Sequence, residues 1–370
     1  METGEWTLRR QERAVFDLRA LYAAYGYSQY KMSKFEEYDL YVRNKSFLIS
    51  DQIITFNGTD GRLLALKPDV TLSIVKNTAD ALRGVQKVYY HENVYRTSAA
   101  SQDFREIPQL GLECLGDIDD YQLFEVLLLA ARSLGRLSPD FVLEISHLDV
   151  ISAVLCSLGL SDEQRAQALG YVGEKNAHDA MALCRAAGVP DELSSRLERL
   201  ITTAGEPAQV MAMLSELADG AQELLPFVRQ LRSLLDVLEE RVGADRLRLD
   251  LSLISDMNYY NGIVFRGYLK GVPTSVLSGG QYDGLMQKMG KRSRAVGFAV
   301  YLDGLQALSE GPVEYDVDTV LLYGEDAPLG ELTAAVGRYE ATGERVLACR
   351  SIPEGLRYRR AVRYNEEERA

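Results

Sequence analysis

The 370-residue sequence predicts an α+β protein with a mostly antiparallel sheet that is flanked by helices. Strand patterns follow one another without a helix between them at residues 85–96 and 104–116. An almost wholly helical stretch, about residues 150–245, then indicates a helical layer or insertion. Strand patterns resume after this stretch in the sequence, which places the insertion within a single sheet-containing core.

Local patterns give the remaining elements. Apolar residues at helical spacing predict helices, whereas short apolar or alternating runs bounded by turn residues predict strands. The predicted helices span residues 8–25, 71–81, 120–134, 301–309 and 329–339. The predicted strands span 51–57 and 62–66, which form a hairpin, and 141–146, 247–253, 262–268, 295–300, 319–322 and 346–348, with 27–36 extended.

The pair Gly311-Pro312 predicts a linker between two domains. We expect residues 1–310 to form the core, which carries the insertion at about 150–245. Residues 313–370 then form a short C-terminal α/β fragment that ends in a polar, charged tail.

Composition narrows the class of function. The formal net charge is −13, which argues against binding of long RNA, because phosphate neutralisation dominates that affinity. The sequence has no transmembrane-length apolar run and no signal-like N-terminus, so a cytoplasmic protein is expected. Four cysteines lie far apart without a CxxC pair, which argues against zinc and against a disulfide framework.

Two arginines flank a small polar loop at residues 97–103, between the strands 85–96 and 104–116. Arg96 ends the first strand and Arg105 begins the second. Guanidinium groups hold phosphate in bidentate fashion, so a phosphate clamp is one interpretation. The alternative is that both arginines pair with Glu92 or Glu106.

The second of these strands carries a candidate ligand-binding face. Gln109, Gly111 and Glu113 share one face by strand alternation, and Gly111 leaves room for a ligand. An amide and a carboxylate suit an ammonium group and a polar side chain. Apolar neighbours indicate that Glu113 is partly buried, and a buried carboxylate needs a partner. The alternative is a surface carboxylate.

Five stretches resemble, in this order, signature stretches of histidyl-tRNA synthetase, a class II aminoacyl-tRNA synthetase. They are Lys67-Pro68-Asp69-Val70-Thr71; Tyr95-Arg96 with Phe104-Arg105-Glu106, Gln109 and Glu113; Tyr259-Tyr260; Gly279-Gly280-Gln281-Tyr282-Asp283; and Gly297-Phe298-Ala299 to Leu305. The resemblance covers roughly residues 8–309 and implies a class II synthetase-like core. It also implies a histidine pocket, with Gln109 and Glu113 at the ammonium group, Asp69, Thr71 and Arg96 nearby, and Tyr259, Tyr260 and Tyr282 at the imidazole.

Departures from the family pattern point away from catalysis. Ser255 stands in place of the family's activating arginine, Gln281 replaces another arginine, and Asp303-Gly304 replaces a Glu-Arg pair that grips ATP. Adenylation builds negative charge on ATP, so each lost arginine raises the barrier by several kcal/mol, roughly a thousandfold in rate. Ser98 also replaces an acidic residue, and Ser33 replaces a proline.

The short C-terminal fragment is a further departure, because residues 313–370 are too few for the synthetase's anticodon-reading domain. In this respect the chain resembles the regulatory subunits of ATP phosphoribosyltransferase, which are non-catalytic synthetase paralogues. That resemblance implies a short-form catalytic subunit as partner and a homodimer within a hetero-oligomer. It implies a requirement in the first step of histidine biosynthesis and feedback by histidine. No catalytic residue, cofactor or metal is expected, and tRNA binding is not expected.

Two alternative functions stay open. The chain could be an active histidyl-tRNA synthetase-like aminoacylating enzyme, or a scaffold that binds no ligand. Two motifs also have plain structural alternatives, since Tyr259-Tyr260 could be a core strand pair and Gly279-Gly280 a tight turn.

Overall fold

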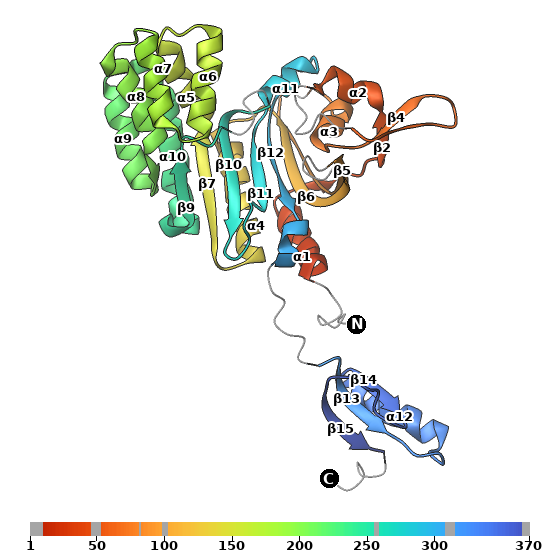
Figure 1. Cartoon of the computed structure of the whole chain (residues 1–370). Helices are drawn as coiled ribbons and strands as arrows, with labels where there is room; N and C mark the ends of the chain where they lie inside the picture. Colours follow the sequence, from red (N-terminus) through yellow and green to blue (C-terminus); the bar gives the residue numbers. More distant parts are fainter. Residues whose placement is uncertain are drawn as a thin grey trace. The chain divides into compact units, whose positions relative to one another are not determined.

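The computed structural model describes residues 10–45, 53–80, 83–97, 103–254, 259–307 and 315–364. Contacts along the chain separate a large unit, Gln11–Ala307, from a second unit that includes Leu308–Ala370 (Figure 1). The linker predicted at Gly311-Pro312 lies outside the described residues, as does most of the loop predicted at 97–103. The domain boundaries of the sequence analysis therefore stay predictions.

The large unit is built on a nine-stranded sheet in the order β1-β5-β6-β12-β11-β10-β7-β9-β8. Seven of these strands are β1 (Ser28–Gln29), β5 (Val85–Thr97), β6 (Phe104–Gly116), β7 (Phe141–His147), β8 (Ala204–Gly205), β9 (Leu247–Asp250) and β10 (Asn261–Leu269). The other two are β11 (Leu277–Gln281) and β12 (Arg294–Tyr301). Only the β1–β5 and β7–β9 pairings within this sheet are parallel. The predicted α+β class with a mostly antiparallel sheet is confirmed.

Helices α1 (Arg10–Ala24) and α4 (Asp120–Leu137) cover one face of this sheet. The Tyr22 ring of α1 packs against Tyr89 of β5 and Phe298 of β12, with ring centroids 6.3 and 6.0 Å apart. Asp119 begins α4 with a capping box that satisfies its first backbone N–H groups. Every second residue of the sheet strands therefore faces these helices, and the alternate residues face the opposite side.

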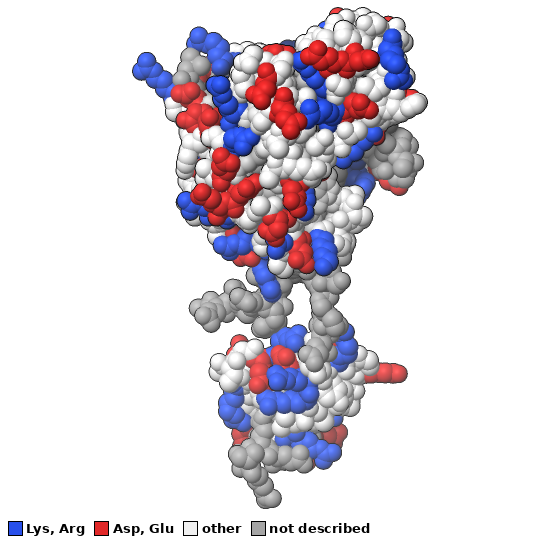
Figure 2. All heavy atoms as spheres, turned by 90° about the vertical axis from the view of Figure 1, so that its left-hand side faces the viewer, with Lys and Arg blue, Asp and Glu red and all other residues white. Residues whose placement is uncertain are grey.

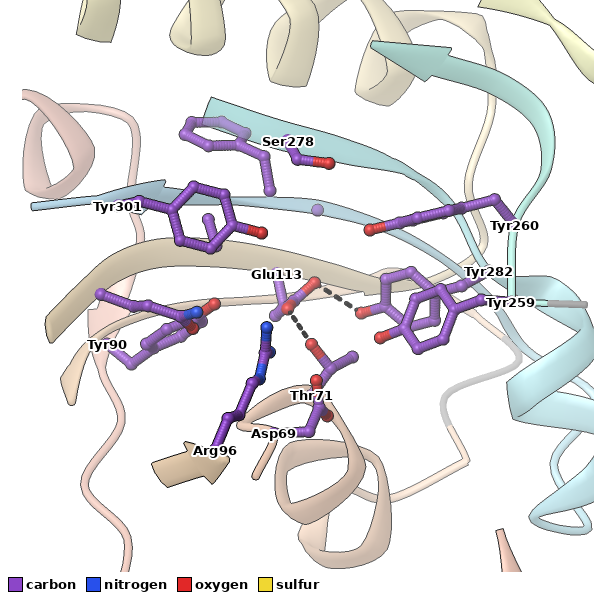
Figure 3. Close-up of a pocket in the computed structure, with 14 residues that line it drawn as sticks. Asp69, Thr71, Tyr90, Arg96, Glu113, Tyr259, Tyr260, Ser278, Tyr282 and Tyr301 are labelled. Carbon is purple, nitrogen blue, oxygen red and sulfur yellow. Dashed lines mark hydrogen bonds between the residues drawn. The ribbon is translucent and has the colours of Figure 1, made fainter. Parts of the chain in front are cut away.

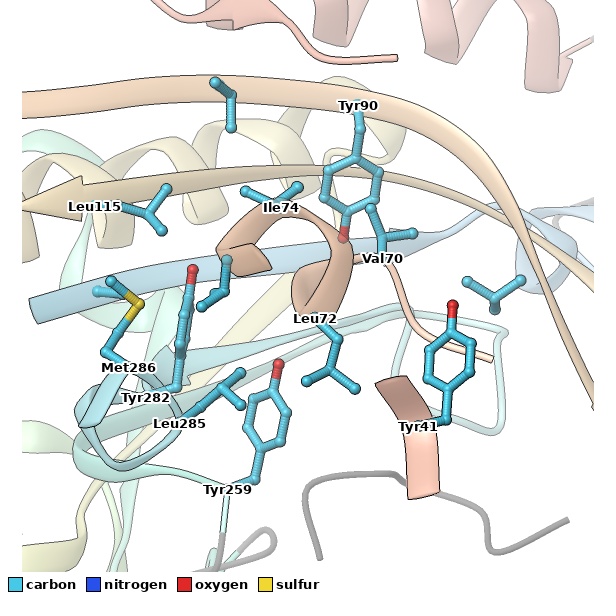
Figure 4. Packing of buried hydrophobic residues seen from close by; sticks show 14 of the residues in the cluster. Tyr41, Val70, Leu72, Ile74, Tyr90, Leu115, Tyr259, Tyr282, Leu285 and Met286 are labelled. Carbon is cyan, nitrogen blue, oxygen red and sulfur yellow. The ribbon is translucent and has the colours of Figure 1, made fainter. Parts of the chain in front are cut away.

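The opposite face carries a second apolar layer, which includes α3 (Thr71–Asn77) and α11 (Asp283–Lys288). Figure 4 shows Leu72, Tyr259, Tyr282, Leu285 and Met286 packed together in this layer. Burial of such side chains is the main favourable term in folding. The layer also fixes the entry of the chain into β10, because Tyr259 lies just before that strand.

A small antiparallel sheet, in the order β2-β4-β3, lies beside helix α2 (Tyr38–Arg43). Its strands are β2 (Phe35–Glu37), β3 (Thr55–Asn57) and β4 (Leu63–Leu66). The predicted hairpin is confirmed, because β3 and β4 pair antiparallel across the glycine-containing turn.

The predicted helical insertion is a layer of helices that follows β7 and leads into β9. Its helices are α5 (Leu148–Ser157), α6 (Asp162–Gly173), α7 (Ala177–Ala186), α8 (Asp191–Thr202), α9 (Pro207–Asp219) and α10 (Leu225–Val242). Their leucines form a core, as Leu197, Leu214 and Leu231 are each fully buried. Figure 2 shows acidic and basic side chains intermixed on the face that carries these helices. Within the described ranges, no helix is long and apolar enough to span a bilayer.

The second unit contains a parallel sheet in the order β14-β13-β15 with helix α12 (Leu329–Ala341). Its strands are β13 (Val317–Leu322), β14 (Val346–Cys349) and β15 (Tyr358–Arg363). The short α/β fragment is confirmed. The polar, charged tail predicted after residues 346–348 contains a strand that was not predicted, because residues 358–363 pair with β13.

One central strand was not predicted. Residues 277–281 form β11, which pairs with both β10 and β12. The alternative interpretation of Gly279-Gly280 as a tight turn is therefore wrong. A side chain at Gly279 would meet the Phe298 side chain at 2.4 Å, so the glycine allows a close approach to the neighbouring strand.

Candidate ligand-binding site

A pocket opens on the face of the large sheet that is turned away from α1 and α4 (Figure 3). Its cavity volume is about 50 Å³, so the side chains of its walls fill most of the space above the sheet. All eight residues that the sequence analysis selected line it. The lining comprises Asp69, Thr71, Tyr90, Arg96, Gln109, Glu113, Tyr259, Tyr260, Ser278, Tyr282, Gly297, Phe298, Ala299 and Tyr301.

The register of the strands builds the floor of this pocket. Gly111 of β6 lies between Tyr90 of β5 and Ala299 of β12, and Ser278 of β11 is opposite Ala299. Residues opposite one another in an antiparallel pair share a face of the sheet. A row of mostly small residues therefore crosses the floor, with the tyrosine at its β5 end.

Glu113 is the most buried charged group of the pocket, with only 2% of its surface exposed. Its Oε1 accepts a hydrogen bond from Thr71 Oγ1 at 2.8 Å, and its Oε2 accepts one from Tyr282 Oη at 2.7 Å. Burial raises the pKa of the Glu113 carboxyl to about 8, although both hydroxyl donors act to lower it. The alternative of a surface carboxylate is wrong.

Glycines on neighbouring strands make room for the polar groups. A Cβ at Gly297 would lie 1.8 Å from Glu113 Oε2, so only glycine is compatible with the position of this carboxylate. A Cβ at Gly111 would lie 2.5 Å from the Tyr90 hydroxyl oxygen. The expectation that Gly111 leaves room for a ligand is therefore wrong, because the Tyr90 side chain occupies that space.

Asp69 and Arg96 form the charged wall next to Glu113 (Figure 3). Asp69 Oδ1 accepts a hydrogen bond from the Leu72 backbone N–H at 2.8 Å at the start of α3. Burial raises the pKa of Asp69, while that hydrogen bond and the Arg96 charge oppose the rise. Arg96 Nε donates to the Pro68 carbonyl at 3.0 Å, which holds the guanidinium at the pocket edge.

The alternative pairings of the two arginines are not formed in the part of the chain that the structure describes. Glu92 pairs with the buried Lys67, whose Nζ lies 2.5 Å from Glu92 Oε2. Glu106 accepts hydrogen bonds from Asn93 and Tyr95. Arg105 instead lies 3.6 Å from Asp303 at an exposed position, where such a pair contributes little to stability.

Aromatic rings line the remaining wall. The Tyr259 and Tyr260 rings meet edge to face with centroids 4.6 Å apart, and the Tyr282 ring lies 6.0 Å from Tyr259. Burial raises the pKa of all three tyrosines well above its usual range, so their hydroxyls stay protonated. The Tyr259-Tyr260 pair precedes β10 and does not form a strand, although Tyr259 is part of the core.

Three of the departures from the synthetase pattern lie within the described residues, at Ser33, Gln281 and Asp303-Gly304. Ser33 Oγ accepts a hydrogen bond from the Phe35 backbone N–H at 3.3 Å. The Gln281 side chain accepts a hydrogen bond from the Ile263 backbone N–H at 2.8 Å and is buried. Gln281 is therefore an uncharged side chain that bonds within the sheet, where the synthetase pattern has an arginine. A Cβ at Gly304 would have Val276 as its nearest neighbour at 3.5 Å, so the site has space but no side chain. Ser255 and Ser98 lie outside the described residues.

Sequence reasoning missed six residues of the pocket lining. They are Tyr90, Ser278, Gly297, Phe298, Ala299 and Tyr301. Gly297 to Ala299 were recognised within a motif but not as pocket residues. Tyr90 lies on the predicted strand 85–96, where its alternation with core residues was the available signal. Tyr301 falls in the predicted helix 301–309, and this prediction is wrong for it because the residue ends β12. Ser278 could not be found in this way, because its strand was not predicted.

The antiparallel sheet, with a pocket of buried carboxylates, one arginine and several tyrosines, defines a class II aminoacyl-tRNA synthetase-like protein. More particularly, the chain belongs to the histidyl-tRNA synthetase family, whose model matches residues 2–305.

Relatives within this family carry two different names. The chain is similar to an ATP phosphoribosyltransferase regulatory subunit of Oceanobacillus iheyensis, with 27% identity over 81% of this chain and 74% of the relative. It is also similar to a histidine–tRNA ligase of Methanocaldococcus jannaschii, with 28% identity over 77% of this chain and 68% of the relative. The predicted resemblance to both is confirmed.

Solved structures show the same fold. An ATP phosphoribosyltransferase regulatory subunit/histidyl-tRNA synthetase from Bacillus halodurans has a TM-score of 0.78 at 24% identity, over 96% of this chain and 93% of that one. A chain of the ATP phosphoribosyl transferase complex from Thermotoga maritima has a TM-score of 0.62 at 21% identity, over 79% of this chain and 97% of that one.

Proposed function

We propose that this chain is a non-catalytic regulatory subunit of ATP phosphoribosyltransferase, required for the first step of histidine biosynthesis, and that it senses histidine. One observation carries the proposal. The pocket keeps buried carboxylates and tyrosines that suit an amino acid, while Gln281 and Gly304 stand where the synthetase pattern has arginines. A site of this kind binds its ligand without the charge stabilisation that adenylation requires.

Histidine suits the chemistry of the pocket walls. Asp69 and Glu113 place two carboxyl groups beside a cavity, and an ammonium group would relieve the unfavourable burial of their charge. The rings of Tyr259, Tyr260 and Tyr282 offer apolar faces for an imidazole and protonated hydroxyls as donors. These residues, with Thr71, Arg96 and Gln109, are the proposed histidine site.

The names of the relatives support a catalytic subunit as the partner of this chain. The name of the Oceanobacillus relative contains "regulatory subunit", and the Thermotoga structure is of an ATP phosphoribosyl transferase complex. We take the partner to be a short-form catalytic subunit that performs the chemistry, with this chain as a homodimer in a cytoplasmic hetero-oligomer. The acidic net charge of −13 favours a role without tRNA.

Reconstitution tests this function. The purified chain is mixed with a short-form catalytic subunit, and phosphoribosyl transfer is measured with and without histidine. We expect transfer to depend on this chain and histidine to inhibit it. Equal activity with and without the chain, at every histidine concentration, would rule the function out.

An active synthetase is the second candidate, because a histidine–tRNA ligase is among the relatives and the family model is that of the synthetase. An active synthetase would need cationic side chains at the described positions where this chain lacks the family's arginines. The open space at Gly304 is the position where a single substitution could add one without displacing a neighbour.

A further inference from the structure

Arg266 of β10 lies one strand beyond the lining of the pocket. It is opposite Ser278 of β11, and Ser278 is opposite Ala299 of β12. Both of these partners line the pocket. Because paired residues share a face of the sheet, Arg266 stands on the pocket face, with its Cβ about 5 Å from that of Ser278.

Only small side chains lie between Arg266 and the centre of the pocket floor. The row that crosses the floor from Arg266 consists of Ser278, Ala299 and Gly111, whose side chains are small or absent. A guanidinium on its flexible stem is long enough to extend over one such neighbour. Arg266 is half-buried, which is consistent with a position at the pocket rim.

The charge of Arg266 acts on a group inside the pocket, the Tyr301 hydroxyl. Burial raises the pKa of the Tyr301 hydroxyl, and both Arg96 and Arg266 act to lower it. Tyr301 lines the pocket, so two guanidinium groups lie within electrostatic reach of the same wall. They come from opposite sides, since β5 and β10 are separated in the sheet by β6, β12 and β11.

The other neighbours of Arg266 define the structural alternative. Glu144 of β7 is opposite Arg266, and Tyr268 Oη donates to Glu144 Oε2 at 3.4 Å. Burial raises the pKa of Glu144, Asp250 adds to the rise, and Lys175 and Arg266 oppose it. Arg266 donates a hydrogen bond to the Tyr268 hydroxyl, whereas no ion pair within 4.0 Å joins it to Glu144 among the described residues.

A free amino acid needs a cation as well as an anion from its site. The pocket lining supplies two carboxyl groups but a single guanidinium, Arg96, which already donates to the Pro68 carbonyl. A buried carboxylate without a cationic partner is strongly disfavoured. We infer that Arg266 binds the free α-carboxylate of the amino acid and thereby selects an unactivated amino acid. This inference rests on the proposed function.

Calorimetry with histidine and histidinol tests this inference. Histidinol keeps the imidazole and the ammonium group but has a hydroxymethyl group in place of the carboxylate. We expect the full-length chain to bind histidine more tightly than histidinol by about tenfold or more, as a charge-assisted hydrogen bond would give. Arg266→Gln should remove most of this preference by weakening histidine alone, while Arg266→Lys should keep part of it.

Glu144→Gln is the matched control, because it removes the charge of the cross-strand neighbour and leaves the guanidinium in place. It should keep the preference for histidine, and thermal melts should show that each variant is folded. An unchanged preference in Arg266→Gln, or an equal loss of both ligands, would overturn the inference alone. A wild-type chain that binds neither ligand would overturn the proposed function together with it.

Discussion

Glu113 is a carboxyl group removed from water with two hydroxyl groups as hydrogen-bond donors, those of Thr71 and Tyr282. Neither donor carries a charge, which is why burial dominates and raises the pKa of Glu113 to about 8. A cationic ligand would change this balance, because it stabilises the ionised carboxylate. The residue is therefore matched to an ammonium or imidazolium group that arrives from solution.

Removal of this charge should weaken histidine binding. Glu113→Gln keeps the size of the side chain but cannot become an anion, so the histidine affinity should fall by about tenfold to a hundredfold. Glu106→Gln is the control on the same strand, since Glu106 is exposed and accepts hydrogen bonds from β5. Isothermal calorimetry measures both, and equal effects of the two substitutions would contradict the assignment.

Histidine binding should also release a proton. Below about pH 8 the Glu113 carboxyl of the free protein is mostly protonated, and a bound cation lowers its pKa. Affinity should therefore rise with pH from about 7 to 8, where the imidazole of free histidine is already mostly neutral. Calorimetry at pH 7 in buffers of different ionisation enthalpy measures the release, which Glu113→Gln should abolish. A release that persists in this variant would assign the proton to another group.

At the scale of elements, the structure shows how much the sequence could predict. Strand β6 was predicted with its bounds, Phe104–Gly116, because its apolar pattern is long and is bounded by polar residues. Strand β11 was missed, because two adjacent glycines in five residues argue against a strand. What makes it a strand is tertiary, namely the close approach of Phe298 and Tyr260 to Gly279 and Gly280.

The candidate site, like the strands, could be predicted only in part from the sequence. Motif spacing brought eight residues into one prediction, and the structure brings all eight around one pocket. Their role in holding histidine stays a prediction. Ser278 and Arg266 were out of reach, because their place depends on the register of β10, β11 and β12. Register is fixed by packing between strands and not by any one segment.

A glycine substitution tests the fit between β6 and β12. In Gly297→Ala the new Cβ would overlap Glu113 Oε2 and approach the Leu112 carbonyl oxygen at 2.5 Å. We expect a loss of about 3 kcal/mol in the free energy of unfolding, together with weaker histidine binding. Gly284→Ala on α11 is the control, because its Cβ meets nothing within 4 Å and its effect should stay within about 1 kcal/mol. Urea unfolding measures both, and similar stabilities for the two variants would contradict this account of Gly297.

On the scale of the whole molecule, the two units contain separate sheets. The large unit holds the nine-stranded sheet and the pocket, while the second unit has its own sheet and a small apolar cluster around Leu321, Ala335 and Tyr339. A chain that ends at residue 310 should therefore fold and bind histidine with an affinity within about threefold of the full chain. Far-ultraviolet circular dichroism and calorimetry check this. An unfolded truncated chain would contradict the predicted domain boundary.

The central claim is that the pocket binds histidine but does not activate it. Histidine-dependent exchange of pyrophosphate into ATP tests this claim most directly, on a preparation whose histidine binding has been verified by calorimetry. The account predicts binding without exchange above background, because Gln281 and Gly304 supply no charge to a nucleotide. Exchange at a turnover of about 1 per second or faster, typical of an enzyme, would contradict it.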